Sequence, residues 1–426
     1  MAFFDYKNNV LHAEDVSLSA LADLYGTPFY CYSYGALASS YDDYARAFAD
    51  YPGEFRLCFS VKSNSNQAIL ASLASMGAGA DCVSEGEIRR ALAAGVAPRS
   101  VVFAGVGKTD AELAFALDVG IFMFNVESES ELYRLNRIAT EKNARALVAF
   151  RVNPDVDAGT HHKISTGRKR DKFGVAYDDA ERLYAEASKM EGVDPFGVDM
   201  HIGSQLTSLE PFRLAFDKLA ELVLRLRASG RRIEHIDIGG GLGVSYGIGK
   251  MPPSIDDYAD LAIKILGKLN CSLTIEPGRS IVANAGVLVA RAVAVKKAGD
   301  AHFLIVDAAM NDLIRPSFYD AYHDILPVRR HDERRVLPQD VVGPICETGD
   351  IFASGRPMQE IKPGECVAIS GSGAYGAVMG SNYNTRVFPP ELLTRGSDAF
   401  VVRPRQTYDE IIGKDVVPPW IVSAAS

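Results

Sequence analysis

The chain has 426 residues, a net charge of −9 and 47% hydrophobic residues, enough for two domains with a large core. The acidic balance argues against nucleic acid or an anionic membrane as a partner, because both attract basic surfaces. The sequence contains no apolar run long enough to span a membrane and no signal-peptide pattern at its start. Six cysteines, none of them in a CxxC pair, indicate a reduced, cytoplasmic protein.

From residue 55 onward, short apolar runs alternate with amphipathic stretches. The runs are continuously apolar, which predicts parallel strands covered on both faces. They span residues 55–62, 78–84, 100–105, 121–126, 145–153, 196–203, 235–240 and 273–278. Helices are predicted between them, because Ser84 and Ser128 each stand three residues before a glutamate, which is the spacing of a capping box. Repeated strand–helix units predict a (β/α)8 barrel, with a doubly wound sheet as the alternative.

After about residue 285 the pattern changes to short strands separated by turns rich in Gly, Pro and Asp. The segment 27–35, TPFYCYSYG, is also strand-like. We therefore expect an α/β barrel at 30–285 and a mostly β domain, a sandwich or a barrel, made of 1–29 and 286–426. No low-complexity linker separates the two, so we expect them to pack closely.

Polar residues stand at the ends of the predicted barrel strands, where the active sites of such barrels gather. Lys62 ends the first strand, Asp81 lies on the second, His201 ends the sixth and Glu276 ends the eighth. An unpaired ammonium is costly to bury. Lys62 is therefore either a strand-end lysine with a surface head group or an amine whose chemistry is needed.

Glycine-rich turns accompany these side chains. The run Gly239–Gly243 follows the seventh strand, and Gly278 with Arg279 follows the eighth. Backbone N–H groups at such glycines can approach a phosphate closely. An amine for an aldehyde, an anion cradle and a carboxylate for a ring nitrogen together predict pyridoxal 5'-phosphate. Taken singly, the lysine, the histidine and the glycine turn each also fit a purely structural role.

The ordered motifs resemble those of the diaminopimelate decarboxylase family. Members of this family are fold-type III pyridoxal phosphate enzymes with a barrel like that of alanine racemase. The similar blocks run from about residue 55 to 385. They are FSVKSN (59–64), HIGSQ (201–205), GGGLG (239–243), EPGR (276–279), MNDLIRPSFYDAYH (310–323), GPICETGD (343–350), SGAYG (372–376) and SNYN (381–384).

This resemblance implies a role for each matched residue, and no metal. Lys62 forms the Schiff base, His201 stacks on the cofactor ring, Glu276 faces its nitrogen, and Cys346 is the proton donor. The further cofactor contacts are Asp81, Ser204, Gly240, Gly241, Gly278, Arg279 and Tyr375. The distal end of the substrate is bound by Arg279, Arg315, Tyr319, Glu347 and Tyr375. Cys346 is expected to reach the active site of the partner subunit, which implies a homodimer.

The implied activity is the decarboxylation of meso-2,6-diaminopimelate to L-lysine and CO2, the last step of lysine biosynthesis. The alternatives are an ornithine- or arginine-type decarboxylase of the same fold, a racemase, or a non-catalytic homologue that binds pyridoxal phosphate. The basic amino acids lack the distal carboxylate that a bidentate arginine such as Arg315 suits.

Three further expectations concern local structure. Apolar surroundings are expected to keep the Lys62 amine neutral when it is released. The polar segment 154–174 after the fifth strand is expected to be a loop that covers the active site. Ala309 stands where the family usually has a glycine, and it would be strained if the backbone there requires a positive φ.

Overall fold

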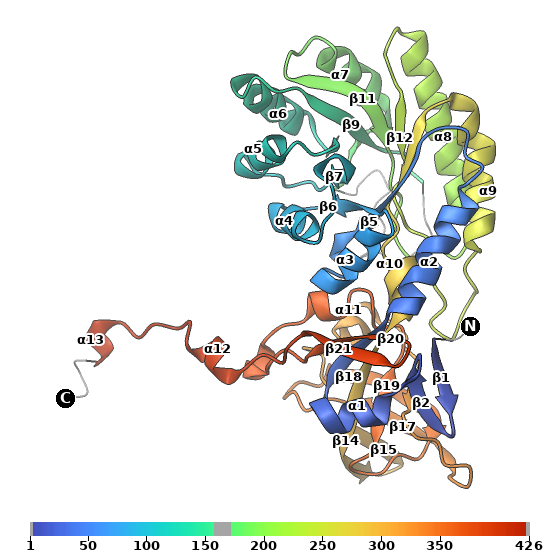
Figure 1. Cartoon of the computed structure of the whole chain (residues 1–426), viewed down its shortest axis with the longest axis vertical. Helices are drawn as coiled ribbons and strands as arrows, with labels where there is room; N and C mark the ends of the chain where they lie inside the picture. Colours follow the sequence, from blue (N-terminus) through green and yellow to red (C-terminus); the bar gives the residue numbers. More distant parts are fainter. Residues whose placement is uncertain (1–2, 157–171, 423–426) are drawn as a thin grey trace. The chain divides into compact units, whose positions relative to one another are not determined.

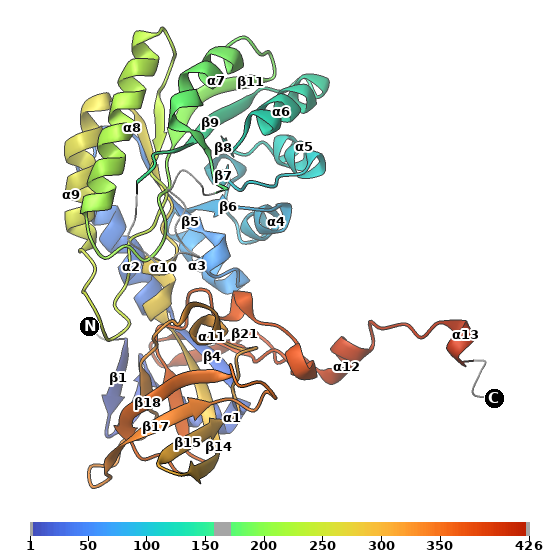
Figure 2. The same cartoon turned by 180° about the vertical axis from the view of Figure 1, so that it is seen from behind.

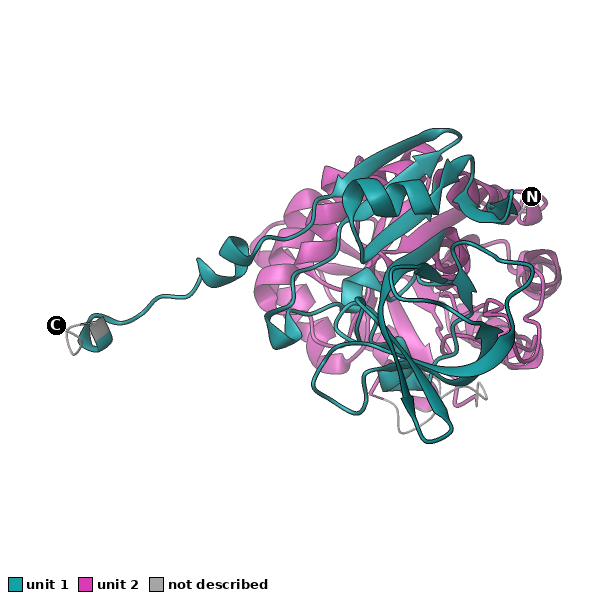
Figure 3. Ribbon diagram, turned by 90° about the horizontal axis from the view of Figure 1, so that it is seen from below, with its two compact units in different colours: residues 1–33, 286–426 teal, residues 34–285 magenta. Residues whose placement is uncertain are grey.

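The structure is a computed structural model that describes residues 3–156 and 172–422. The chain divides into two compact units (Figure 3). One unit is Tyr34–Ala285, and the other combines Met1–Ser33 with Gly286–Ser426. Within the described residues, no helix combines the length and the apolar character that a membrane span requires.

The first unit is a closed barrel of parallel strands, which confirms the predicted (β/α)8 fold. Each strand pairs with the next along the chain, and β13 closes the ring onto β5. This closure excludes the doubly wound sheet, in which two strands would remain unpaired edges. The barrel strands are β5 (Phe55–Ser60), β6 (Gly79–Cys82), β7 (Val101–Phe103), β8 (Met123–Val126), β9 (Ala146–Asn153), β11 (Val193–Asp199), β12 (His235–Asp237) and β13 (Ser272–Ile275). The short β10 (Val175–Ala176) pairs in parallel with the last two residues of β9, Val152 and Asn153.

Helices surround these strands (Figures 1 and 2). They are α2 (Tyr34–Ala47), α3 (Gln67–Ser75), α4 (Glu85–Ala93), α5 (Asp110–Val119), α6 (Glu129–Glu141), α7 (Ala180–Ala187), α8 (Glu210–Ala228), α9 (Ile255–Leu266) and the short α10 (Arg279–Val282). In α8, for example, Phe212, Phe216 and Leu219 are buried at helical spacing, as expected for a face against the sheet.

Only one of the two hydrogen bonds of each predicted capping box forms. Ser84 accepts a hydrogen bond from the Glu87 N–H at 3.2 Å, but the Glu87 carboxylate accepts from the Val83 N–H, not from that of Ser84. Ser128 and Glu131 repeat this pattern, with the Glu127 N–H as the donor to Glu131. Both serines still cap their helices, so the predicted helix starts are confirmed. A complete box occurs instead at Thr109, where α5 begins.

The second unit is rich in β-structure. Its larger sheet has the order β18-β17-β15-β14-β4-β20-β21, with β19 paired to β14 and β16. These strands are β4 (Phe29–Ser33), β14 (Gly286–Ala298), β15 (Ala301–Val306), β16 (Ile325–Pro327), β17 (Val336–Val342), β18 (Ile351–Gln359), β19 (Cys366–Ile369), β20 (Glu391–Arg395) and β21 (Asp398–Arg403). Because β4 lies between β14 and β20, the N-terminal segment contributes a central strand.

Smaller elements complete this unit. A three-stranded sheet of β1 (Phe4–Lys7), β2 (Val10–Ala13) and β3 (Val16–Ser17) precedes α1 (Leu18–Tyr25). Leu11, Phe29, Val289 and Leu392 share one buried core cluster, which ties the N-terminal elements to the larger sheet. A single turn of helix, α11 (Arg315–Tyr319), follows β15.

The last part of the described chain is a C-terminal arm, residues 407–422, with the short helices α12 (Tyr408–Ile412) and α13 (Pro419–Val422) (Figure 1). A capping box between Thr407 and Glu410 starts α12. The arm carries exposed apolar side chains, including Val416 and Trp420, which is 75% exposed.

Candidate active site

Lys62 lies at the carboxyl end of β5, in the 3-10 turn Val61–Ser63. Its Nζ is 2.6 Å from Oδ2 of Asp81, which lies on the neighbouring strand β6 and is completely buried. Ser60 Oγ donates to the same oxygen at 2.7 Å. Ser60 and Asp81 are directly paired in the β5–β6 register, which explains why the three side chains meet. The other oxygen of Asp81, Oδ1, has no hydrogen-bond partner.

The expected apolar surroundings of the Lys62 amine are wrong, because the amine lies against a buried carboxylate. A buried carboxylate at hydrogen-bond distance favours the ammonium form of a lysine. The Lys62 side chain is also 37% exposed, so water reaches it. This ion pair could not be predicted from the residues of β5 alone, because Asp81 lies on a separate strand. The contact with Asp81 therefore holds the amine as an oriented group.

Glu276 follows β13 and is 6% exposed. Burial raises the pKa of its carboxyl well above the ordinary value, and the nearby carboxyls of Asp237, Asp81 and Asp199 raise it further. One oxygen of Glu276, Oε1, has no hydrogen-bond partner. A buried carboxyl with an unsatisfied oxygen is unfavourable in the protein alone. It fits a cationic N–H donor brought by a ligand.

Asp237, at the end of β12, lies beside Glu276 inside the barrel. Its oxygens accept hydrogen bonds from the Gly239 N–H at 2.9 Å and from Asn125 Nδ2 at 3.2 Å. Burial raises the pKa of Asp237 to about 6, although hydrogen bonds with Gly239, Glu276 and Asn125 oppose the rise. Asp199 stands next to Asp237 in the β11–β12 register, and burial raises its pKa well above the ordinary value. We call the carboxyl ends of the barrel strands the mouth. The mouth thus holds a layer of closely spaced carboxyls, those of Asp81, Asp199, Asp237 and Glu276.

The glycine turn after β12 packs against the end of β11. The Gly240 N–H donates to His201 Nδ1 at 3.2 Å, so the proton of the neutral imidazole is on Nε2. Burial lowers the pKa of His201 well below its ordinary value, helped by the positive charges of Arg151 and Lys62. A Cβ at Gly240 would overlap the carbonyl oxygen of Glu276, and one at Gly241, where φ is +114°, would overlap that of Gly203. Glycine is therefore required at both positions.

Arg279 begins α10 and is 7% exposed. Its guanidinium donates to Ser204 Oγ, from Nε at 3.2 Å and from Nη2 at 3.1 Å, and Nη1 donates to Tyr246 Oη at 2.8 Å. At Gly278 a Cβ would lie 2.8 Å from that of Ser60. The structure thus brings Ser204, Arg279 and the two glycine turns together at one end of the barrel.

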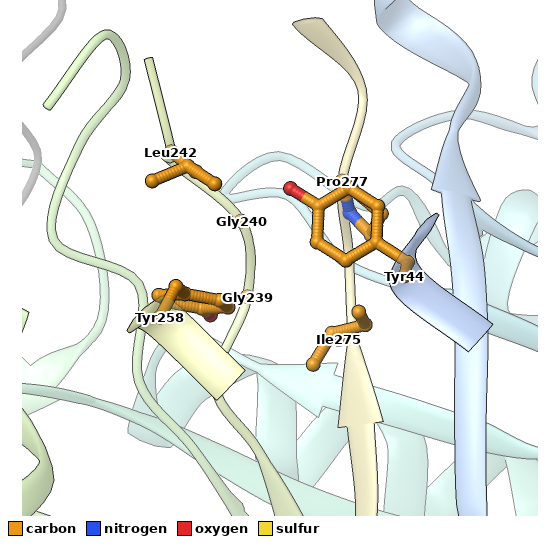
Figure 4. A pocket seen from close by; sticks show the side chains of 7 residues that line it. All are labelled: Tyr44, Gly239, Gly240, Leu242, Tyr258, Ile275 and Pro277. Atoms are coloured by element: carbon orange, nitrogen blue, oxygen red, sulfur yellow. The ribbon is translucent and has the colours of Figure 1, made fainter. Parts of the chain in front are cut away.

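A small pocket lies behind the glycine turn (Figure 4). It is lined by Tyr44, Gly239, Gly240, Leu242, Tyr258, Ile275 and Pro277. Tyr44 and Tyr258 come from helices α2 and α9, so this space lies between the strand ends and the outer helices. It contains none of the charged groups of the mouth. We therefore place the candidate cofactor site at the mouth and not in this pocket.

The geometry and chemistry of the residues at the mouth fit pyridoxal phosphate. The unsatisfied Glu276 carboxyl suits a protonated ring nitrogen, and the oriented Lys62 amine suits an aldehyde. Turns that tolerate no side chain, together with Arg279 and Ser204, suit a phosphate.

The second unit carries the other predicted site residues. Arg315 starts α11 and is 5% exposed. Its Nη1 lies 2.9 Å from Nε2 of His323. Tyr319, four residues after Arg315, is half-buried and packs edge-on against Phe318 with the ring centroids 4.8 Å apart.

Cys346 and Glu347 lie in the turn between β17 and β18, and both are exposed. The Cys346 N–H approaches Asn384 Oδ1 at 3.5 Å, and Tyr383 Oη donates to Glu347 Oε2 at 2.9 Å. Tyr375 has a φ of +55°, a conformation that non-glycine residues rarely adopt. Of the other cysteines, Cys366 is half-buried and four are buried, namely Cys31, Cys58, Cys82 and Cys271.

Of the two remaining local expectations, the structure tests the one at Ala309. Ala309 is completely buried and has no positive φ, and its N–H donates to Asp312 Oδ2 at 2.9 Å. The alanine is therefore not strained, because this backbone does not need a glycine. In the expected covering loop 154–174, residues 157–171 lie outside the described residues.

Several polar residues of the site were missed from the sequence. Arg151 on β9 pairs with Glu127 at 3.2 Å and contributes to the low pKa of His201. Asp199 and Asp237 fill the barrel interior, and His323 contacts Arg315. The available signal was a charged residue inside an apolar run, as in FRVN, VDMH and IDIGG.

Comparisons with known proteins indicate one family, and the similarity to individual relatives covers nearly the whole chain. Residues 35–283 match the family described as pyridoxal-dependent decarboxylase, pyridoxal binding domain. A diaminopimelate decarboxylase of Pseudomonas aeruginosa is 49% identical, over 98% of this chain and 100% of the relative. One from Zymomonas mobilis is 43% identical, over 98% of this chain and 99% of the relative.

Solved structures give the same result. Diaminopimelate decarboxylase of M. jannaschii in complex with L-lysine is 37% identical, with a TM-score of 0.93 and 98% of each chain covered. The enzyme of Helicobacter pylori with L-lysine is 39% identical, with a TM-score of 0.89, over 96% of this chain and 99% of that one. A lysine decarboxylase of Selenomonas ruminantium, at 22% identity and a TM-score of 0.79 over 88% of this chain and 95% of that one, shares the fold.

Proposed function

We propose that this chain, which belongs to the diaminopimelate decarboxylase family of pyridoxal-dependent enzymes, converts meso-2,6-diaminopimelate to L-lysine and CO2. The observation that carries the proposal is the barrel mouth, where an oriented amine at Lys62 and an unsatisfied buried carboxyl at Glu276 accompany a full-length match to this family. The choice of substrate rests on the relatives and on the buried Arg315.

Pyridoxal phosphate is the cofactor, and the chain offers a separate group for each of its parts. Lys62 would hold the aldehyde carbon, with Asp81 orienting the amine. Glu276 would accept the ring N–H, and His201 would lie against the ring face. Ser204, Gly240, Gly241, Gly278 and Arg279 would surround the phosphate, together with Tyr375 of the second unit.

The reaction exchanges a carboxylate for a proton at one carbon of the substrate. When bound, the cofactor supplies an electron sink that lets the bond between Cα and the carboxylate break. Glu276 keeps that sink effective, because an acidic partner favours a protonated ring nitrogen. The carbon then needs one proton, and Cys346 Sγ, or the Lys62 amine, is the donor we propose.

The end of the substrate that does not react must also be recognised. A guanidinium can bind a carboxylate through two parallel hydrogen bonds, which gives direction as well as charge. We assign the distal carboxylate to Arg315, Arg279 and Tyr319, and the distal ammonium to Glu347. Tyr375 is the remaining proposed substrate contact. Ornithine and arginine would leave Arg315 without this partner.

We propose a homodimer in which Cys346 serves the partner's active site. The exposure of Cys346 and Glu347 in the single chain supports this proposal, because a proton donor and a binding carboxylate act best when water is excluded. A dimer interface over this turn would provide that exclusion.

The experiment is to measure CO2 release by the holoenzyme from meso-diaminopimelate, L-lysine, L-ornithine and L-arginine. We expect turnover with meso-diaminopimelate that collapses in Arg315→Ala. Turnover with only a basic amino acid would reject the substrate and keep the decarboxylase. No CO2 from any of them, with cofactor bound, would reject the enzyme in favour of a binding protein.

A further inference from the structure

His323 is completely buried, and its ring contacts Arg315 on one side and the backbone on the other. Its Nδ1 is 2.7 Å from the carbonyl oxygen of Ser370, and its Nε2 is 2.9 Å from Arg315 Nη1. A carbonyl oxygen can only accept, so Nδ1 carries a proton. A guanidinium can only donate, so Nε2 accepts from Arg315. The contacts on both sides thus define one neutral tautomer of the ring.

The backbone around His323 is held as firmly as its ring. The Ser370 N–H donates to the carbonyl of Asp324 at 2.8 Å, and the next residues pair as β16 with β19. Arg356 Nη1 donates to the carbonyl oxygen of His323 at 2.9 Å. The imidazole is therefore attached to the sheet of the second unit, whereas Arg315 sits on a single helical turn.

We propose that His323 is a positioning residue, which sets the direction of the Arg315 guanidinium so that it receives the distal carboxylate of the substrate. This inference rests on the proposed function, and it adds a residue that touches neither the substrate nor the cofactor. A free arginine side chain samples many rotamers, and part of this freedom is lost on binding. A group that orients the guanidinium beforehand reduces that loss.

The neutral imidazole is suited to this task. A carboxylate in its place would also orient Arg315, but it would neutralise the guanidinium and compete with the carboxylate of the substrate. An imidazole that accepts one hydrogen bond leaves the positive charge in place. The arrangement therefore separates the orientation of Arg315 from its charge.

Two substitutions separate the two functions of the ring, which are to accept a hydrogen bond from Arg315 and to donate one to Ser370. His323→Gln can place a side-chain oxygen near the position of Nε2, which retains an acceptor for Arg315. His323→Asn can place its amide near the position of Nδ1, which retains the donor to Ser370 but leaves Arg315 without that acceptor. The pair serves as a matched control, because both variants remove the ring.

The readout compares two ligands that differ by the distal carboxylate. L-lysine, the product, keeps that carboxylate, and cadaverine lacks it. Each is measured as a competitive inhibitor of the holoenzyme and by calorimetric titration. In His323→Asn we expect L-lysine to bind about tenfold more weakly, the effect of one hydrogen bond to a charged group, and cadaverine to change less than about twofold. KM for meso-diaminopimelate should rise more than kcat falls.

Rescue and coupling complete the test. His323→Gln should keep most of the preference for L-lysine over cadaverine. In an Arg315→Lys background, His323→Asn should weaken L-lysine binding by much less than tenfold, because the two residues act through one contact. If His323→Asn does not yield folded protein, His323→Gln alone and with Arg315→Lys decides the question.

Three results would overturn the inference. The first is equal weakening of L-lysine and cadaverine, which would indicate a purely structural role. The second is a His323→Gln variant that loses its preference for L-lysine, and the third is an unchanged affinity of His323→Asn for L-lysine. Wild-type turnover of meso-diaminopimelate tests the proposed function separately, so failure of one is distinguishable from failure of the other.

Discussion

The barrel mouth and the turn between β17 and β18 present their candidate groups in opposite ways. In the mouth, Asp81 is completely buried and Glu276 is 6% exposed, and neighbouring strands supply their partners. In the turn, Cys346 and Glu347 are exposed. The barrel thus buries its candidate groups among its own strands, whereas the turn leaves its candidate groups open to water. We propose that a second subunit covers this turn.

Removal of the Lys62 amine is the strongest test of the mouth. Lys62→Ala should abolish covalent retention of the cofactor and lower turnover by roughly 10⁴-fold, because it removes the amine that acts directly on the aldehyde. Absorbance of the purified holoenzyme and CO2 release measure the two effects. Asp81→Asn is the matched variant, which keeps the amine and removes its charged partner. It should retain cofactor with a smaller loss of turnover, and equal losses in both variants would contradict a distinct role for the amine.

The second prediction tests the turn. Cys346→Ala should lower kcat by about 10²-fold, the contribution of a positioned proton donor. Cys366→Ala, at a half-buried cysteine of the same unit, should keep the turnover of the wild type. Mixing inactive Lys62→Ala with Cys346→Ala should restore activity if subunits exchange, because a mixed dimer contains one intact site. Persistent inactivity in a verified mixed dimer would contradict the shared site.

The third prediction concerns the carboxyl layer of the mouth. The pKa of Asp237 in the folded protein is about 6, above its unfolded value, so the folded state holds the proton more tightly. The stability from this group is complete below the unfolded pKa and is lost as the pH rises through about 6. Between pH 5 and pH 7.5 the loss is on the order of 1 kcal/mol in the free energy of unfolding.

Denaturant unfolding of the cofactor-free protein and of Asp237→Asn at both pH values checks this sign. The substitution should flatten the dependence on pH by about that amount, while the raised pKa values of Glu276 and Asp199 leave a residual slope of the same sign. The matched control is Asp312→Asn in the second unit, whose carboxyl has a pKa of about 6 and lies outside the mouth. A steeper slope in Asp237→Asn would refute the assignment.

A helix cap outside the site distinguishes residues that only stabilise the barrel from residues that act in the site. Thr109→Ala removes the capping box at the start of α5 and should lower the free energy of unfolding by about 1 kcal/mol. Cofactor content and turnover should remain those of the wild type, because the capped turn is exposed and lies outside the site we propose. Thermal unfolding and CO2 release measure both quantities. A loss of turnover at full cofactor occupancy would show that this helix start contributes to the site.

The barrel was predictable because each strand is a continuous apolar run bounded by helix signals. The side chains of its mouth followed from one rule, that strand ends meet at one edge. The rule located Lys62 and Asp81 but did not reveal their ion pair, because pairing depends on the register between β5 and β6. Asp199 and Asp237 were missed for a related reason, since a carboxyl inside an apolar strand shows no partner in the sequence.

Less of the second unit could be predicted from the sequence. Its strands were recognisable, but the order of its sheet places β4 between β14 and β20, far from both along the chain. Arg315, Cys346 and Glu347 carried no signal apart from their resemblance to a family. His323 was visible in the motif MNDLIRPSFYDAYH, and only the distances to Arg315 and Ser370 give it a role.

The position of Trp420 determines what an optical experiment on this protein can detect. It is the single tryptophan of the chain, it lies in the C-terminal arm, and it is 75% exposed. Intrinsic tryptophan emission therefore reports the surroundings of the arm and is insensitive to melting of the barrel. Unfolding of the barrel has to be followed by circular dichroism or tyrosine emission. A change in the tryptophan spectrum with protein concentration would instead show the arm being covered.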